Sequence, residues 1–181
     1  NKLYVHSDSG IINQWKMNTV GNTDTTVREF ASKFATLTGS IGANGLVLDS
    51  DNSKLYIGGD SVNIIQRYSF NSNTGFTSLI FDSNFSTDSI GGISGMSFAD
   101  SNSRLHVTSG NKISQITIDS DLFQNSVINQ ENYTIGAPLS DSAIGIAWHS
   151  GGSRFTIIGT NSTSNALETF TTQNNYSVKS I

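Results

Sequence analysis

Imidazole side chains are the first place to look for chemistry, because histidine serves as a metal ligand and as a general base near neutral pH. His6, His106 and His149 are the only histidines in the chain. No two of them are four residues apart, as a metal-binding pair on one face of a helix would be. We therefore expect each to have a structural or surface role. The alternative is a site assembled from several repeats around a common axis.

Two acidic segments, residues 49–52 and 119–121, carry oxygen-bearing side chains at alternate positions, as calcium loops do. The EF-hand pattern also requires Gly at its sixth position and Glu at its twelfth. Counting from residue 49, Lys54 and Asp60 stand there instead. A tight hairpin turn explains the first segment without a metal. We predict no metal and no cofactor, with calcium as the alternative.

Other catalytic patterns are missing from the sequence. There is no Gly-x-Ser-x-Gly turn to present a nucleophilic serine, and no glycine-rich loop followed by Lys to hold phosphate. The 14 acidic residues are scattered, so no pair can be assigned to glycoside hydrolysis. We predict that the protein is not an enzyme.

The composition narrows the classes of partner. Only 13% of the residues are charged and the formal net charge is −4, so a broad basic surface for nucleic acid is excluded. Many Ser, Thr and Asn residues, 17 Gly and a single Pro indicate an all-β chain with many tight turns. There are no cysteines, and no apolar run approaches the length of a membrane span, so we predict no membrane insertion. The chain begins with Asn rather than Met, from which we expect a processed or excerpted polypeptide.

The chain is built from a repeat of about 50 residues. A Gly-apolar-x-apolar motif begins at three glycines: Gly45, Gly95 and Gly145. After a short turn, a basic-apolar-x-apolar motif begins at four basic residues: Lys2, Lys54, Arg104 and Arg154. Both motifs alternate apolar and polar residues, which predicts two strands of a hairpin.

Each unit continues with two further strands. The third alternates apolar and polar residues over 12–17, 65–70, 113–118 and 167–171. The fourth is less regular, over 26–34, 76–81, 125–134 and 176–181. Repeats of this length with four short antiparallel strands are typical of propeller blades, which bury both faces of each sheet against neighbouring blades.

We therefore predict an all-β fold, a single β-propeller domain or propeller fragment over residues 1–181. The expected blades are 1–40, 41–90, 91–140 and 141–181. Tandem sandwiches and a β-solenoid are alternatives that fit the repeat length less well. The first unit lacks its opening strand, so its blade is incomplete. The alternative to a closed ring of four blades is that the chain forms part of a larger ring. We expect an upstream segment or another chain to complete the open edge, because unpaired strand edges recruit other strands.

The repeat resembles a propeller unit found in bacteriophage virion proteins and bacterial surface proteins. The best-matching unit contains Gly45-Leu46-Val47-Leu48, Lys54-Leu55-Tyr56-Ile57, Gly59-Asp60 and Ile65-Gln66-Arg67-Tyr68-Ser69-Phe70. The repeat is also similar to YncE-like and WD40-like propellers, although no Trp-Asp dipeptide is present. The resemblance implies a virion or cell-surface protein that acts as a scaffold or adhesion platform, with other virion or surface proteins as partners.

Aromatic residues provide the candidate ligand contacts. Most of them occupy repeat positions that point between blades, so we expect them to pack in the core. Trp148 ends an innermost strand near the expected channel mouth, with His149 beside it, and Tyr133 and Tyr176 lie in the irregular outer strands. These four residues are our predicted ligand contacts.

Three functions therefore remain, in order of preference. The first is a non-enzymatic structural, decoration or tail-associated protein of a virion. The second is a secreted or surface module that binds carbohydrate, with cell-surface glycans as ligands. The third is an enzyme with a site at the axis. The first two place the protein on a virion or outside the cell.

Overall fold

In a computed structural model, the chain forms four antiparallel sheets and, within the described residues, no helix. The structure describes residues 2–6, 11–17, 28–36, 43–49, 53–59, 63–71, 75–87, 90–99, 104–117, 131–136, 141–149, 151–161 and 163–173. No described segment is a helix long and apolar enough to cross a membrane.

Each sheet is a meander in which strands pair in chain order, and each falls inside one of the four expected blade ranges. Blade 1 consists of β1 (Lys2–His6), β2 (Ile11–Met17) and β3 (Arg28–Thr36). Blade 2 consists of β4 (Ala43–Asp49), β5 (Lys54–Gly59), β6 (Ile64–Asn71) and β7 (Gly75–Ser86). Blade 3 consists of β8 (Gly95–Ala99), β9 (Arg104–Ser109), β10 (Lys112–Thr117) and β11 (Glu131–Thr134). Blade 4 consists of β12 (Ser142–Trp148), β13 (Arg154–Thr160) and β14 (Asn165–Thr171).

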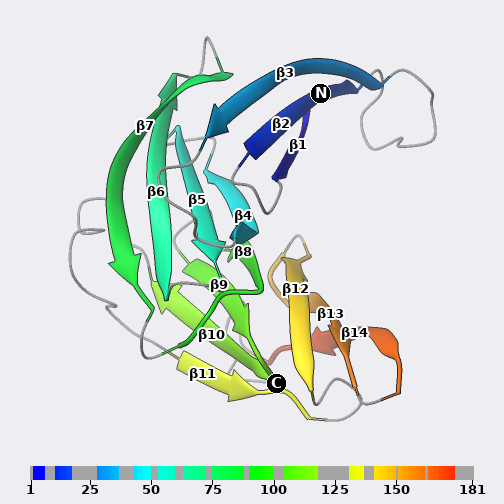
Figure 1. The fold of residues 1–181 in the computed structure, drawn as a ribbon. Coiled ribbons are helices and arrows are strands. Elements are labelled where there is room, and N and C mark those ends of the chain that lie inside the picture. Colours follow the sequence, from blue (N-terminus) through cyan, green and yellow to red (C-terminus); the bar gives the residue numbers. More distant parts are fainter. Residues whose placement is uncertain are drawn as a thin grey trace.

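The blades follow one another in an arc with β1, β4, β8 and β12 on its inner side (Figure 1). In the part of the chain that the structure describes, the arc is open between blade 4 and blade 1. The prediction of an all-β propeller with four blade repeats and an incomplete first blade is confirmed. The fourth strand expected for blade 4, residues 176–181, lies outside the described residues.

The outer strands differ from expectation in length. β7 extends from Gly75 to Ser86, well beyond the expected 76–81. Its register against β6 shifts between Arg67 and Tyr68 and again between Ser69 and Asn71. These irregularities interrupt the period-two alternation of apolar and polar residues. The predicted strand therefore ended before the observed one.

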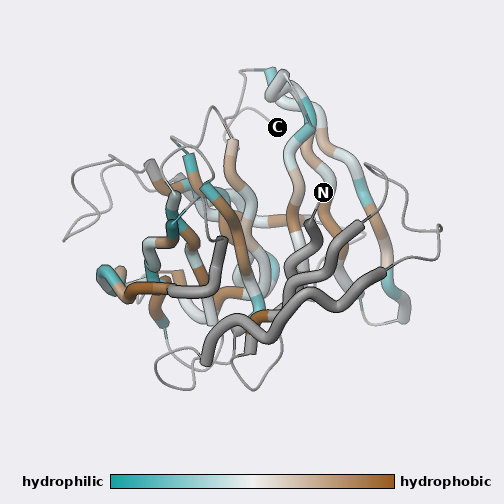
Figure 2. Tube along the Cα trace, turned by 90° about the horizontal axis from the view of Figure 1, so that it is seen from above, coloured by the Kyte–Doolittle hydropathy of each residue, from teal (hydrophilic) through white to brown (hydrophobic). Residues whose placement is uncertain are grey.

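The hydrophobic core lies between the blades rather than inside any one sheet. Buried residues form three clusters, one for each pair of adjacent blades. Ile12 of blade 1 packs against Leu55 and Ile57 of blade 2. Viewed from above, the hydrophobic segments lie mostly within the strands and the hydrophilic ones toward their ends (Figure 2). Each blade therefore depends on its neighbours to bury its apolar faces.

Backbone hydrogen bonds between blades repeat with the sequence. The Ile93 N–H of blade 3 donates to the Gly59 carbonyl of blade 2 at 2.8 Å, and the Ala143 N–H of blade 4 donates to the Gly110 carbonyl of blade 3 at 2.7 Å. Because donors and acceptors recur about 50 residues apart, the same junction joins both pairs of blades. Each junction lies beside an innermost strand, so it fixes the spacing of the blades around the arc.

Candidate functional site

The structure places two of the four predicted ligand contacts at the junction of blades 3 and 4. Trp148, the last residue of β12, is half-buried, and its ring centroid lies 4.7 Å from that of His106 on β9 and 4.9 Å from that of Phe155 on β13. Tyr133 of β11 is half-buried and, like Trp148, packs against the hydrophobic cluster that joins blades 3 and 4. His149 follows Trp148 and is exposed. Tyr176 lies outside the described residues, and ligand contact at all four stays a prediction.

The contact between His106 and Trp148 is a repeated feature of the arc. Fifty residues earlier, Tyr56 of blade 2 meets Phe98 of blade 3 edge to face, with ring centroids 5.2 Å apart. Tyr56 and His106 occupy the same repeat position, as do Phe98 and Trp148. Trp148 therefore packs between blades, as the other repeat aromatics were expected to.

His106 is fully buried at this junction. Its Nε2 lies 3.1 Å from Oε1 of Gln115, a hydrogen bond in which the ring nitrogen donates to the amide oxygen. A general base needs access to the proton it removes. Buried between Trp148 and Gln115, His106 is positioned to join the blades rather than to meet a substrate.

An exposed row of polar side chains lies on blade 4. His149 Nε2 is 2.8 Å from Thr156 Oγ1, which is 2.9 Å from Thr169 Oγ1. A hydroxyl beside an imidazole is the start of a nucleophile–base pair, which also requires a third group to orient the base. Among the described residues, the hydrogen bonds of this row continue to a second threonine and reach no carboxylate. The row is therefore suited to polar contact with a partner more than to covalent catalysis.

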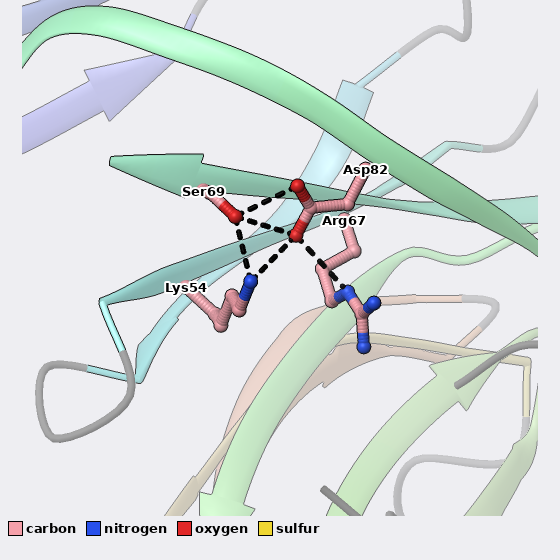
Figure 3. Close-up of polar contacts among 4 residues, drawn as sticks. All are labelled: Lys54, Arg67, Ser69 and Asp82. Atoms are coloured by element: carbon pink, nitrogen blue, oxygen red, sulfur yellow. Dashed lines mark hydrogen bonds and ion pairs between the residues drawn. The ribbon is translucent and has the colours of Figure 1, made fainter. Parts of the chain in front are cut away.

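Four residues of blade 2 form an ionic network that sequence reasoning missed (Figure 3). Lys54 Nζ of β5 lies 2.7 Å from Asp82 Oδ2 of β7 and 2.6 Å from Ser69 Oγ of β6. The Ser69 hydroxyl in turn lies 2.7 and 2.6 Å from the two carboxylate oxygens of Asp82. Arg67 Nε completes the network, 3.4 Å from Asp82 Oδ2. Three strands of one blade are thereby tied together.

The electrostatics of this network are those of a structural link. Burial by itself would raise the pKa of Asp82, but hydrogen bonds from Lys54 and Ser69 and the positive charges of Lys54 and Arg67 lower it below its ordinary value. A carboxylate with a lowered pKa is a weak base. Lys54 Nζ donates hydrogen bonds to both Asp82 and Ser69, so it is not placed to take a proton from Ser69 and activate it as a nucleophile.

A partial signal for this network was present in the sequence. Three of the four basic residues that open a second strand pair with a hydroxyl residue on the third: Lys54 with Ser69, Arg104 with Thr117 and Arg154 with Thr171. The fourth, Lys2, pairs with Lys16. The contribution of Asp82 had no signal, because it lies on the irregular stretch of β7. The repeated basic position therefore indicated a polar partner on the third strand, but not the acid that completes the network.

No group of three or more His, Asp or Glu residues in the described ranges could hold a metal ion. Asp49, from the first calcium-like segment, is buried at the end of β4, and residues 50–52 and 119–121 lie outside the described residues. Burial raises the pKa of the nearby Tyr56 phenol, with the charges of Asp49 and Asp82 acting in the same direction and Arg67 opposing them. Tyr56 thus stays neutral at physiological pH.

Comparison with known proteins supports the fold. No protein-family model matches the sequence, and no curated protein matches it. Among solved structures, a nidogen/laminin complex matches with a TM-score of 0.66 and 14% identity over 94% of this chain and 58% of that chain. The β-propeller domain of Cps50 (Swd1) from Myceliophteria thermophila matches with a TM-score of 0.53 and 13% identity over 87% of this chain and 46% of that chain.

A putative 6-phosphogluconolactonase from Bacteroides uniformis ATCC 8492 also matches, with a TM-score of 0.59 and 9% identity over 97% of this chain and 53% of that chain. At such low identities the likeness concerns the fold alone. The chain has a β-propeller fold. It spans about half the length of the solved chains that it matches.

Proposed function

We propose that the protein is a non-enzymatic scaffold, a rigid arc of blades that presents other molecules or joins them. The observation that carries this proposal is that the polar groups bind other parts of the protein itself. His106 is buried between two blades, and Lys54, Ser69 and Asp82 bind one another. His106 thus joins two blades and the ionic network joins the strands of one blade, while the exposed pair of His149 and Thr156 continues to a second threonine.

Rigidity is the physical basis of a scaffold role. Blades 2 and 3 bury both faces of their sheets, and the junctions between blades combine apolar packing with backbone hydrogen bonds. Closely packed interiors transmit force with little deformation. An arc built in this way keeps its exposed loops and faces at fixed separations, as a structural component requires.

Within this role, we assign the protein to a virion, as a decoration or tail-associated component, or to a cell surface. Support comes from the resemblance of its repeat to propeller units of bacteriophage virion and bacterial surface proteins. Its partners would then be other virion or surface proteins. The low charge fits contacts made by hydroxyl and amide groups rather than by ion pairs.

Glycan binding is the alternative role. It would use aromatic rings as stacking platforms, which must be accessible on one face. Of the candidate residues that the structure describes, Trp148 packs between His106 and Phe155, and Tyr133 is half-buried against the core. The scaffold role is therefore preferred.

The test is to purify particles from the source and count the copies of this protein in each by quantitative mass spectrometry. A fixed number of copies per particle is expected. Absence from washed particles would remove the virion assignment. A glycan array run on the purified protein addresses the alternative: specific binding that is lost in Tyr133→Ala would favour the carbohydrate-binding role.

A further inference from the structure

Blade 4 has a sheet face that nothing in the described structure covers, which we call the open face. Its large aliphatic side chains are Ile144, Ile158 and Leu167, with exposed fractions of 47%, 48% and 70%. Thr156 and Thr169 lie among them in the ladder, since Thr156 pairs with Thr169 and Ile158 with Leu167. The open face thus combines three large aliphatic side chains with a short row of hydroxyls.

The position of Leu167 shows that this exposure is abnormal for the repeat. The ladders place Leu167 at the same repeat position as Ile12, Ile65 and Ile113. Those three isoleucines have an exposed fraction of 0%. Each is buried by the blade that follows it. Among the described residues, no following blade covers Leu167 of blade 4.

The burial of whole strands agrees. In β5 five consecutive residues are buried and in β9 four, so both faces of these strands are covered. In β13 buried and exposed residues alternate, so only one face of the sheet meets the rest of the protein. The terminal repeat of a stack normally carries polar residues on its outer face to remain soluble. Three large aliphatic residues are the opposite of such a cap and mark an interaction surface.

The repeat also shows what kind of surface covers this position. In each junction, the third-strand isoleucine shares a cluster with a second-strand aliphatic residue of the next blade. The three pairs are Ile12 with Ile57, Ile65 with Val107, and Ile113 with Ile157. The residue that a following blade must bring to Leu167 is therefore a second-strand aliphatic at this repeat position.

Blade 1 carries such a residue. Lys2 begins the basic-apolar-x-apolar motif of β1, so Val5 occupies the position of Ile57, Val107 and Ile157, and Leu3 that of Leu55. In this chain, blade 1 has no preceding blade among the described residues. Blade 4 thus needs a following blade, and blade 1 needs a preceding one.

We propose that the open face of blade 4 binds blade 1 of a second copy of this chain, head to tail. A contact of this kind closes into a ring when its rotation permits, and otherwise extends into a filament. Two copies contain about as much repeat as one solved propeller domain, since this chain matches 46% of the Cps50 (Swd1) domain. We therefore infer a ring of two arcs. Such pairing does not depend on whether the protein belongs to a virion.

The first test is the mass in solution, measured by light scattering after size exclusion. Twice the chain mass of 19.4 kDa is expected. Leu167→Asp places a charge in the open face. It should therefore raise the dissociation constant of the dimer at least tenfold and favour the monomer. Ile80→Asp is the matched control, because Ile80 is 65% exposed on β7 of blade 2, away from the open face. A monomer at all concentrations, or equal effects of the two variants, would overturn the proposal.

The second test fixes the orientation and uses the absence of native cysteines. One tagged copy carries Leu167→Cys and a second, differently tagged copy carries Val5→Cys. After mixing and mild oxidation, we expect a disulfide that joins the two differently tagged copies through these cysteines. Leu167→Cys mixed with Ile80→Cys should give no specific product. Disulfide formation between two copies of Leu167→Cys would show a face-to-face dimer and would overturn the head-to-tail arrangement.

Discussion

Gly95 meets Gly145 where the innermost strands of blades 3 and 4 lie side by side. A Cβ atom on Gly95 would lie 2.7 Å from the Gly145 Cα and 2.8 Å from the Ile144 carbonyl oxygen. One repeat earlier, a Cβ atom on Gly45 would lie 3.4 Å from the carbonyl carbon of Gly95. The repeated glycine is therefore explained by the close approach of neighbouring inner strands, which leaves no room for a side chain.

Gly95→Ala should destabilise the protein by about 1–3 kcal/mol, because backbone atoms must move to accept the methyl group. Urea unfolding measures the change. Gly136→Ala is the control: a Cβ there would meet nothing within 4 Å, so a change within about 0.5 kcal/mol is expected. Equal losses in the two variants would show that the inner strands are not tightly packed.

Asp82→Asn should destabilise the protein by about 1–3 kcal/mol at pH 7. The substitution removes the negative charge between Lys54 and Arg67, whose side chains are only 29% and 14% exposed, so two partly buried cations lose their counter-ion. The free energy of unfolding from urea titrations measures the loss. Lys112→Gln is the control, since Lys112 is exposed on β10, and it should stay close to the wild type.

The same carboxylate predicts the response of the protein to acid. Its pKa is lower in the folded state than the ordinary value of 3.8, so the folded state favours the ionised form. The resulting stability is fully present above the ordinary pKa and is lost as pH falls through the lowered one. Wild type should therefore lose more stability than Asp82→Asn between about pH 4 and pH 2. Parallel pH profiles for the two proteins would contradict this.

Much of the fold was predictable because the repeat is written into the sequence. Four basic residues spaced about 50 apart located the second strands, and the inner and third strands followed from period-two alternation. Outer strands were harder, since the bulges that adapt β7 to β6 break the alternation. The repeat predicts the strands that all blades share. It does not predict a bulge that occurs in one blade alone.

The sites were less predictable for a related reason. The repeat placed Tyr56 and His106 at one position, and Phe98 and Trp148 at another. Nothing in the spacing shows that these positions meet across a junction, because that depends on how the blades pack. Trp148 was therefore expected near a channel mouth, and its contact with His106 emerged only from the structure.

The ring contact between His106 and Trp148 should contribute measurable coupling between blades 3 and 4. In a double-mutant cycle of His106→Ala and Trp148→Ala, we expect a coupling energy of about 0.5–1.5 kcal/mol, as for other paired rings. Urea unfolding provides the four free energies. The control cycle pairs His106→Ala with Ile80→Ala, which lies on another blade and should show coupling near zero. Equal coupling in both cycles would mean that the ring contact is not specific.

Ile113→Ala tests whether the blades depend on one another for stability. Ile113 is completely buried in the cluster that joins blade 3 to Phe155 and Ile157 of blade 4, so its truncation should cost about 2–5 kcal/mol. The stability of stacked repeats is largely a sum over interfaces, so weakening the junction of blades 3 and 4 should unfold blade 4 first.

Tryptophan fluorescence can follow that junction. With Trp15→Phe as background, Trp148 is the sole tryptophan and reports on the junction. Its fluorescence should change at lower urea than the far-ultraviolet circular dichroism. Ile80→Ala, at an exposed site, should leave both transitions coincident and within about 0.5 kcal/mol of the background. If Ile113→Ala unfolded in one step with a similarly small loss, the blades would be stable individually, and the dependence of each sheet on its neighbour would be disproved.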